Sequence, residues 1–266
     1  MASLTDLRAL ARALPNAPGM YTFHGNGGVP LYIGKSIHIR TRVLDHLRSA
    51  NDARLNSSTV RFSFIRTAGD IGAQLLEAQQ VKLHQPLYNH RLRRSRRLCT
   101  LKFEHGELTI ANVHEVGGAP SYGLFASRFA AIEGLRAIAD DHLLCYSRLA
   151  IEKLPAGRPC FRHSIRRCLG VCCGKETEDA HRHRLLSALV ERHVQAWPYP
   201  GAIGIIERSP DLQQIHVVRN WSYLGSASDQ AAAKELSKPA AGFDRDGYKI
   251  LVKPLISKTV ELIELP

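Results

Sequence analysis

The sequence predicts an α+β fold: a small mixed β-sheet with flanking helices, then a cysteine-containing and mainly helical segment, then a small α/β unit. Three observations predict it. Residues 1–90 alternate short strand patterns with helical patterns, residues 145–173 hold five of the six cysteines, and residues 197–266 return to short apolar runs between turn residues. A chain of 266 residues is long enough for more than one domain.

Turn residues and apolar spacing define the elements of the first part. Pro15 and Pro18 follow a first helix, and the turn-forming segment 24–30 joins two strands into a hairpin. Ser36 is placed to cap the next helix, and Pro86 closes the last one. The expected elements are, in order, a helix over 5–14, strands over 19–23 and 31–33, a helix over 36–48, a strand over 59–66 and a helix over 70–84.

An arginine-rich segment, residues 91–97, marks the first predicted domain boundary. Beyond it we expect strands over 98–103 and 107–113, a helix over 127–142, the cysteine-rich stretch, helical residues 177–196, strands over 202–207 and 214–219, a helix near 228–237 and a final strand near 247–252. These elements divide the chain into predicted domains 1–97, 98–196 and 197–266.

Positive charge is concentrated at the start of the chain. The formal net charge is +12, and residues 1–100 contribute 15 Lys and Arg against 5 Asp and Glu, whereas the remainder has 21 against 19. We therefore expect an anionic partner at the first domain. The sequence has neither a signal-peptide pattern nor an apolar run of about 18 residues, so we expect a cytoplasmic protein with reduced cysteines.

One ordered set of residues in the first domain suits phosphodiester hydrolysis, which needs a base, cations that stabilise charge on the phosphate, and a metal ligand. The set contains Gly19-Met20-Tyr21, Tyr32-Ile33-Gly34-Lys35-Ser36, Arg42, His46, Glu77 and Pro86-Leu87-Tyr88-Asn89. It resembles the motifs of the GIY-YIG nuclease family. Met20 replaces the isoleucine of the family motif, an apolar exchange that alters no reacting group.

The resemblance implies a role for each residue. Glu77 would bind one divalent cation, Mg²⁺ or Mn²⁺, and its place within an apolar run argues against a solvated helix residue. Tyr32 would be the general base, and Lys35 the nearby cation that lowers its pKa. Tyr21 would orient water or phosphate. An ordinary strand aromatic at Tyr32 and a surface lysine at Lys35 are the alternatives.

Three further residues belong to the catalytic set that the resemblance implies. Arg42 would grip phosphate oxygens, and His46 lies one helical turn further on the same face. A solvated arginine and a histidine without chemistry are the alternatives. Asn89 would hydrogen-bond to backbone near Tyr32, in a catalytic or a structural role.

The rest of the chain resembles the UvrC branch of this family, the nuclease subunit of bacterial nucleotide excision repair, and in particular its short Cho-type members. The matching stretches are residues 122–128, YGLFASR, and 158–172, RPCFRHSIRRCLGVC. Longer members continue into a second nuclease and helix-hairpin-helix motifs, for which we expect no room here. The resemblance implies a single incision on the 3′ side of a lesion in double-stranded damaged DNA marked by UvrB.

Four cysteines of the middle segment form a candidate ligand set, with spacings unlike those of common zinc ribbons. They are Cys145, Cys160, Cys168 and Cys172. Four thiolates suit an iron–sulfur cluster or zinc, and four reduced free cysteines are the alternative. The resemblance implies a four-iron [4Fe-4S] cluster. Cys173 is a competing ligand, and Cys99 is expected to be packed outside the set.

The arginine-rich segment suits contacts with DNA phosphates, which are independent of sequence and weaken with salt. Its candidate DNA-binding residues are Arg91, Arg93, Arg94, Arg96 and Arg97. A solvated linker is the alternative. Residues 200–266 contain no catalytic or nucleic-acid motif, and partner docking is the role left open for them.

Two other functions stay open. A stand-alone, structure-specific GIY-YIG nuclease would need no repair partner, and the cysteine segment argues against it. A non-catalytic DNA-binding protein would keep the nuclease fold without activity, and the presence of Tyr32, Arg42 and Glu77 argues against that reading.

Overall fold

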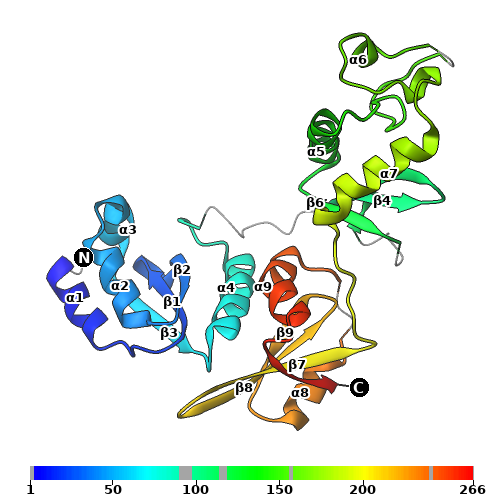
Figure 1. The fold of residues 1–266 in the computed structure, drawn as a ribbon. Coiled ribbons are helices and arrows are strands. Elements are labelled where there is room, and N and C mark those ends of the chain that lie inside the picture. The colour runs from blue at the N-terminus through cyan, green and yellow to red at the C-terminus, as the bar shows by residue number, and fades with distance from the viewer. Residues whose placement is uncertain (1–2, 90–97, 114–118, 156–157, 240–241, 266) are drawn as a thin grey trace. The chain divides into compact units, whose positions relative to one another are not determined.

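The computed structural model describes residues 3–89, 98–113, 119–155, 158–239 and 242–265 (Figure 1). The chain forms two compact units. One combines Met1–Ser95 with Trp197–Pro266, and the other, the middle unit, contains Arg96–Ala196. Within the described residues, antiparallel sheets with helices packed on them give the α+β class that was predicted.

The N-terminal part, residues 3–89, is built on a three-stranded sheet in the order β2-β1-β3. Its elements are α1 (Leu4–Arg12), β1 (Gly19–His24), β2 (Pro30–Ser36), α2 (Ile39–Arg48), α3 (Ala53–Ser58), β3 (Arg61–Arg66) and α4 (Asp70–His84). The predicted elements are present, with α3 in addition. The sheet is antiparallel, not mixed, because β1 and β2 form a hairpin and β3 returns on the other side of β1.

The central strand β1 separates two layers of side chains. Tyr21 and Phe23 pack with α1 and α2, whereas Met20 packs with α4, because successive side chains on a strand point to opposite faces. Apolar residues alternate into β3 at Val60, Phe62 and Phe64, a pattern that predicts one buried face, but Phe64 is 43% exposed. β3 lies at the edge of the sheet, where covering elements do not extend over every side chain.

The C-terminal part, residues 197–239 and 242–265, has a four-stranded antiparallel sheet in the order β10-β7-β8-β9. Its elements are β7 (Ala202–Ser209), β8 (Leu212–Arg219), β9 (Ser222–Ala227), α8 (Gln230–Ser237), α9 (Arg245–Ile256) and β10 (Glu261–Leu265). β9 is an addition to the prediction.

The strand predicted near 247–252 is wrong, because these residues lie within helix α9. Gly247, Leu251 and Leu255 are buried and four residues apart, so they share one helical face. Ile250, Leu251 and Val252 are apolar in succession, which gave a strand-like pattern and obscured this period in the sequence. Asp244 caps the helix by accepting hydrogen bonds from two backbone N–H groups.

The middle unit packs a three-stranded sheet, in the order β5-β4-β6, against α5 and α7. Its elements are β4 (Cys99–Glu104), β5 (Glu107–Asn112), β6 (Ser121–Phe125), α5 (Arg128–Asp141), α6 (Phe161–Ser164) and α7 (Glu178–Leu189). The helix predicted over 177–196 ends earlier: a 3₁₀ turn at Val190–Arg192 follows it, and the N–H of Val194 then donates to the carbonyl of Ser121.

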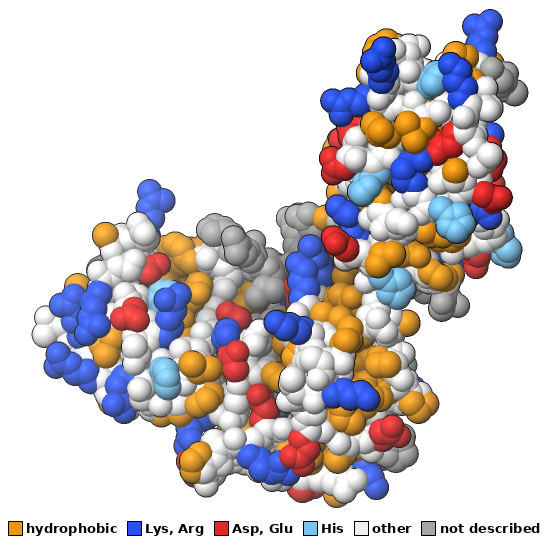
Figure 2. All heavy atoms as spheres, in the orientation of Figure 1, with side chains coloured by type: hydrophobic (Ala, Val, Ile, Leu, Met, Phe, Trp, Pro, Cys, Tyr) orange, Lys and Arg blue, Asp and Glu red, His pale blue; other side chains and the backbone are white. Residues whose placement is uncertain are grey.

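Lys and Arg side chains gather over the side of the N-terminal part that α1, α2 and α3 form (Figure 2). The exposed arginines of these helices are Arg8, Arg12, Arg40, Arg42, Arg48 and Arg54. Part of the positive charge that the sequence concentrates at the start of the chain therefore forms a basic surface on these helices.

Candidate active site

The β1–β2 hairpin brings two tyrosines of the predicted site together. Tyr21 pairs with Gly34 across the ladder, and Tyr32 lies two residues before Gly34, so both side chains are on one face of the sheet. The ring centroids are 6.3 Å apart. A Cβ on Gly34 would lie 2.5 Å from the Tyr21 hydroxyl oxygen and 2.8 Å from Tyr32 Cε1. A glycine is therefore needed beneath the two rings.

Tyr21 is anchored through His46 to Asp52. Tyr21 is only 1% exposed, and its hydroxyl lies 3.0 Å from His46 Nε2. His46 Nδ1 lies 2.9 Å from Asp52 Oδ2. When Nδ1–H donates to the carboxylate, Nε2 is left as the acceptor for the tyrosine hydroxyl. Burial raises the pKa of Tyr21 well above its ordinary value, so its hydroxyl stays protonated at neutral pH.

Arg42 extends this group toward solvent. It is an exposed residue of α2, one turn before His46, and its guanidinium acts on the Tyr21 hydroxyl, where it opposes the effect of burial on the pKa. Burial and the charge of Glu77 raise the pKa of Tyr32, while Arg42 opposes them. Lys35 was predicted to be the cation that lowers this pKa. Among the charges that act most strongly on the Tyr32 pKa, the cation is Arg42, while the ammonium of Lys35 is paired with Asp70.

Lys35 and Glu77 connect β2 to α4. The half-buried Glu77 lies near Lys35, whose backbone N–H and ammonium charge both act to lower the pKa of the carboxyl. The Lys35 side chain is directed to Asp70, with 2.8 Å between Nζ and Oδ1. Asp70 is the first residue of α4 and also accepts a hydrogen bond from Gln74.

Glu77 forms no salt bridge with any residue that the structure describes. Burial raises the pKa of Glu77 to about 7, although the charge of Lys35 acts in the opposite direction. A half-buried carboxylate with so few partners fits a metal ligand, because a bound cation would supply the missing charge.

Asn89 completes the edge of strand β2. Its Oδ1 accepts a hydrogen bond from the N–H of Ile33 at 2.9 Å, and its Nδ2 donates to the carbonyl of Ile33 at 2.8 Å. Because β2 is an edge strand, the amide occupies the place of a neighbouring strand. The predicted contact with backbone near Tyr32 is therefore present, and it fixes the strand that carries Tyr32.

Asp52 and Asp70 were missed by the sequence analysis. Asp52 lies in a 3₁₀ turn after α2, where no local pattern marks it. Asp70 had a usable signal, because an acidic residue in the first turn of a helix is favoured and often has a second partner.

The middle unit brings the four predicted cysteines together. Their Sγ atoms all lie within 4.8 Å of one another, and all but Cys172 are buried. The set consists of Cys145 after α5, Cys160 and Cys168 on either side of α6, and Cys172 in the 3₁₀ turn Val171–Cys173. A site of four converging thiols in a buried cluster suits a soft metal centre.

Local contacts orient these thiols. The N–H of Cys160 donates to Cys172 Sγ at 3.4 Å, and the N–H of Gly170 donates to Cys168 Sγ at 3.3 Å. Burial raises the pKa of Cys160 to about 11. For Cys172 burial acts in the same sense, but hydrogen bonds from the Cys160 N–H and the neighbouring thiols outweigh it and lower the pKa. The cluster therefore needs positive charge to hold four thiolates.

The two remaining cysteines lie outside this set. The thiol of Cys173 contacts the carbonyl of Gly170 at 3.4 Å. Cys99 is partly buried and packs against the apolar core of the middle unit, as expected.

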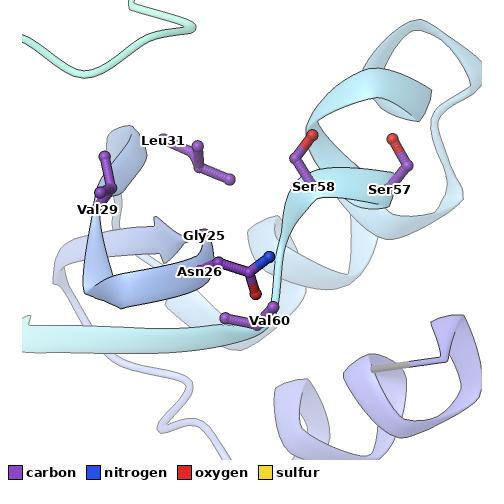
Figure 3. Close-up of a pocket in the computed structure, with 7 residues that line it drawn as sticks. All are labelled: Gly25, Asn26, Val29, Leu31, Ser57, Ser58 and Val60. Carbon is purple, nitrogen blue, oxygen red and sulfur yellow. The ribbon is translucent and has the colours of Figure 1, made fainter. Parts of the chain in front are cut away.

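Figure 3 shows a pocket of the N-terminal part, between the β1–β2 hairpin and the end of α3 with the residues that join it to β3. It has a volume of about 330 Å³ and is lined by Gly25, Asn26, Val29, Leu31, Ser57, Ser58 and Val60. None of the predicted site residues lines this pocket, so it is not the candidate active site.

The predicted DNA-binding residues Arg91, Arg93, Arg94, Arg96 and Arg97 lie outside the described residues. In the described part of the chain, no helix combines the length and the apolar character that crossing a membrane requires.

Three family models match consecutive segments of the chain. Residues 17–90 match the UvrC-like GIY-YIG domain, residues 97–191 match the UvrC/Cho excinuclease middle domain, and residues 202–266 match the excinuclease Cho C-terminal domain.

Relatives match over nearly the whole chain. "Excinuclease cho" of Escherichia coli is 47% identical over 263 residues, covering 97% of this chain and 89% of the relative. The Salmonella typhi protein of the same name is 44% identical, covering 97% and 90%. "UvrABC system protein C" of Caldicellulosiruptor saccharolyticus is 28% identical, covering 68% of this chain and 31% of the relative.

Among solved structures, the GIY-YIG N-terminal endonuclease domain of UvrC from Thermotoga maritima, bound to magnesium as its catalytic divalent cation, is 30% identical. It covers 31% of this chain and 93% of that domain, with a TM-score of 0.29.

Proposed function

The chain belongs to the UvrC/Cho excinuclease family, and on that premise we propose that it is a divalent-metal-dependent DNA endonuclease that makes one incision on the 3′ side of a lesion in UvrB-marked DNA. The observation that carries the proposal is the under-partnered carboxylate of Glu77, whose charge acts on Tyr32 beside Arg42. A metal ligand, a base and a phosphate-binding cation thus come from three different elements to one place.

Glu77 would hold the cation, with water and phosphate oxygens completing its coordination. When bound, a divalent cation supplies Lewis-acid stabilisation of phosphoryl charge and favours ionisation of nearby water and phenol groups. The pKa of Glu77, about 7, is consistent with this role. The carboxylate is ionised at slightly alkaline pH, and a bound cation would then stabilise its charge.

Tyr32 would act as a phenolate: its own proton leaves to solvent, and the phenolate oxygen then accepts the proton of the attacking water. Burial and Glu77 raise the pKa of Tyr32, so the phenol ionises only when positive charge is present in the site. Arg42 contributes part of that charge and is exposed, and its guanidinium can grip two phosphate oxygens while negative charge grows on them.

Tyr21, His46 and Asn89 would act by positioning. The Tyr21 hydroxyl is buried and already hydrogen-bonded to His46. This favours a role in which the Tyr21 ring supports the neighbouring Tyr32 ring over direct contact with phosphate. Asn89 would hold strand β2 through its two hydrogen bonds to Ile33. Lys35 would hold α4 through Asp70.

The four clustered cysteines would bind a [4Fe-4S] cluster, with zinc as the alternative for the same donor set. A tetrahedral zinc site with Zn–S distances of about 2.3 Å needs sulfur atoms about 3.8 Å apart, whereas a cluster needs a larger cage. Iron and sulfide analysis together with visible absorption separates the two: zinc gives neither iron nor visible absorption.

The three segments matched by the family models support a division into a nuclease domain (1–97), a middle domain (98–196) and a C-terminal unit (197–266). The arginines of 91–97 would track DNA phosphates next to the nuclease domain, and lowering their number should reduce the salt dependence of DNA binding.

The test is cleavage of an end-labelled duplex with one bulky adduct, with Mg²⁺ or Mn²⁺, and with or without UvrB. We expect a single 3′ nick that needs both the metal and UvrB. Glu77→Ala should reduce the rate at least a hundredfold, and Leu83→Ala, at a 69% exposed position of the same helix, should not change it.

The other outcomes identify the alternatives. Cutting of undamaged or branched DNA without UvrB would favour a stand-alone nuclease. Binding of DNA without cleavage under any of these conditions would favour a DNA-binding protein, and an unchanged rate in Glu77→Ala would contradict the proposed site.

A further inference from the structure

Helix α4, which carries Glu77, has no N-terminal cap of its own. Its N-cap residue is Gly69, which has no side chain to accept the free N–H groups of the first turn. Instead, Glu207 of β7 accepts them: its Oε1 lies 2.9 Å from the N–H nitrogen of Ile71, and its Oε2 lies 2.8 Å from that of Gly72. These are the N2 and N3 positions that a capping side chain normally serves.

The Glu207 carboxylate takes the place of a cap residue's side chain. A Cβ on Gly69 would overlap the carboxylate of Glu207, and a Cβ on Gly72 would overlap the ring of His216. Gly69 has an extended backbone conformation that any residue can adopt, so the absence of a side chain there serves the close approach of Glu207. The helix and the C-terminal part therefore fit together at two glycines.

Glu207 is itself held in place. His216, which is fully buried, contacts it through Nε2 at 2.9 Å from Oε2, while its Nδ1 lies 2.7 Å from Ser226 Oγ. Despite burial, these contacts and the two backbone N–H groups lower the pKa of Glu207, so it is ionised at neutral pH. A negative charge at this end of a helix is favoured by the helix dipole.

The C-terminal part also contacts the rest of α4. Leu75 belongs to an apolar core with Trp221 and Leu251 of the C-terminal part. At the other end of the helix, Lys82 pairs with Asp244 at 2.5 Å and with Asp246 at 2.9 Å. Figure 1 shows α4 and α9 side by side. The helix is therefore buried between the sheet of the N-terminal part and the C-terminal part.

The capped turn is directly connected to the candidate active site. Asp70 precedes Ile71 and pairs with the Lys35 ammonium, and the charge and backbone N–H of Lys35 act on the Glu77 carboxylate. A change in the first turn of α4 would therefore be transmitted to Glu77 along the helix and through Lys35.

We propose that Glu207, fixed by His216, is a positioning residue that caps α4 from the C-terminal part and so keeps Glu77 in place to bind the divalent cation. The inference rests on the proposed metal role of Glu77. It gives the C-terminal part a function in the nuclease site, without any contact to substrate.

The test compares full-length Glu207→Ala, Gly69→Asp and the double variant. Glu207→Ala removes the cap and should weaken Mn²⁺ binding, measured by calorimetry without DNA, by about tenfold. It should also speed hydrogen exchange of the Ile71 and Gly72 amides. Gly69→Asp alone should weaken binding as well, because its side chain collides with Glu207. In the double variant the new aspartate has room to cap the helix, and Mn²⁺ affinity should return to within about threefold of the original.

Two controls separate this inference from a general loss of stability and from failure of the proposed function. Asp211→Ala breaks another contact between the same parts, the Arg66–Asp211 salt bridge, and should leave Mn²⁺ affinity unchanged. Glu77→Ala should abolish the calorimetric signal, and if it does not, the proposed metal site is wrong whatever Glu207 does.

The inference is overturned if Glu207→Ala lowers the melting temperature but binds Mn²⁺ as tightly as the unaltered protein, or if the double variant shows no recovery. Should Glu207→Ala fail to fold, the double variant and Glu207→Gln keep the question answerable. Gln retains one acceptor for the two N–H groups, so its Mn²⁺ affinity should lie between those of Ala and Glu.

Discussion

Two partly buried glutamates lie at helix α4. Glu207 caps its first turn and Glu77 belongs to its middle, and their surroundings shift the two pKa values in opposite directions. Glu207 has two backbone N–H donors and His216 around it, and its pKa is lowered in spite of burial. Glu77 has one backbone N–H, and burial raises its pKa to about 7. The number of partners, more than the degree of burial, separates a carboxylate that stabilises the fold from one that is available to a cation.

The cysteine cluster of the middle unit extends the comparison. Burial raises the pKa of Cys160 to about 11, as it raises that of Glu77 to about 7, and the neighbouring thiols supply no positive charge that would offset it. Groups of this kind are destabilising when ionised alone and stabilising when a metal joins them.

Cys160→Ser should remove the metal centre and the stability of the middle unit. Metal binding to four thiolates contributes on the order of 10 kcal/mol to folding of small metal domains, so the unit should lose its cooperative unfolding transition. Iron, sulfide and zinc analysis with calorimetric melting measures both effects. Cys173→Ser is the matched control. An equally large loss of metal and stability in this variant would show that Cys173 is itself a ligand.

Glu207→Ala should destabilise the first compact unit by about 3 kcal/mol at pH 7, because two N–H groups and the buried His216 lose their partner. The pKa of Glu207 is lowered by folding, so its contribution is present above the unfolded value of 4.5 and is lost as the pH falls below it. Urea unfolding at several pH values measures this. A difference from the unaltered protein that stays constant down to pH 3 would show that charge is not what stabilises the cap.

Glu77→Gln should instead raise the free energy of unfolding of the metal-free protein. Folding raises the pKa of Glu77 from 4.5 to about 7, so ionisation of the native carboxylate destabilises the fold as the pH rises through this range, and the glutamine variant avoids that cost. The variant should be more stable by up to about 3 kcal/mol at pH 8 and equal at pH 4.

Adding Mg²⁺ tests the metal role of Glu77 directly. Mg²⁺ should raise the melting temperature of the unaltered protein at pH 8, and should leave that of Glu77→Gln unchanged, because only the ionised carboxylate binds it. Equal stabilisation of both proteins by Mg²⁺ would place the metal site elsewhere.

The sequence predicted the site residues that belong to a motif or pattern of neighbouring residues. Tyr21, Tyr32, Arg42 and Glu77 lie at motif positions on strands and helices that the apolar spacing also predicts, and the four cysteines form their own pattern. The same information could not predict Glu207, because its partners Ile71 and Gly72 are more than 130 residues away in the chain. A glycine at a helix N-cap was the one available sign that the cap comes from elsewhere.

Helix α9 was mispredicted for a related reason. Its apolar residues face both the core shared with α4 and the sheet of the C-terminal part, so three of them, Ile250–Val252, stand in succession and resemble a buried strand. Long-range packing, which one sequence does not display, decides between helix and strand in such a segment.

Asn89→Ala should give the smallest effect, because Asn89 is neutral and its two hydrogen bonds to Ile33 involve no charge. We expect a loss of about 1–2 kcal/mol, together with faster hydrogen exchange of the Ile33 amide. Asn89→Asp keeps the acceptor for the Ile33 N–H but turns the donor facing the Ile33 carbonyl into a second oxygen, so it should be at least as destabilising.

Cleavage by folded Asn89→Ala then decides between the two roles of this residue. If Asn89 only holds the edge of β2, incision at a temperature where the variant is fully folded should fall by no more than a few fold, and Mn²⁺ affinity should not change. A loss of a hundredfold or more without loss of the fold would mean that the amide acts on the reacting groups. Asn89 would then belong with Glu77 among the residues whose bonding is completed only when metal and substrate are present.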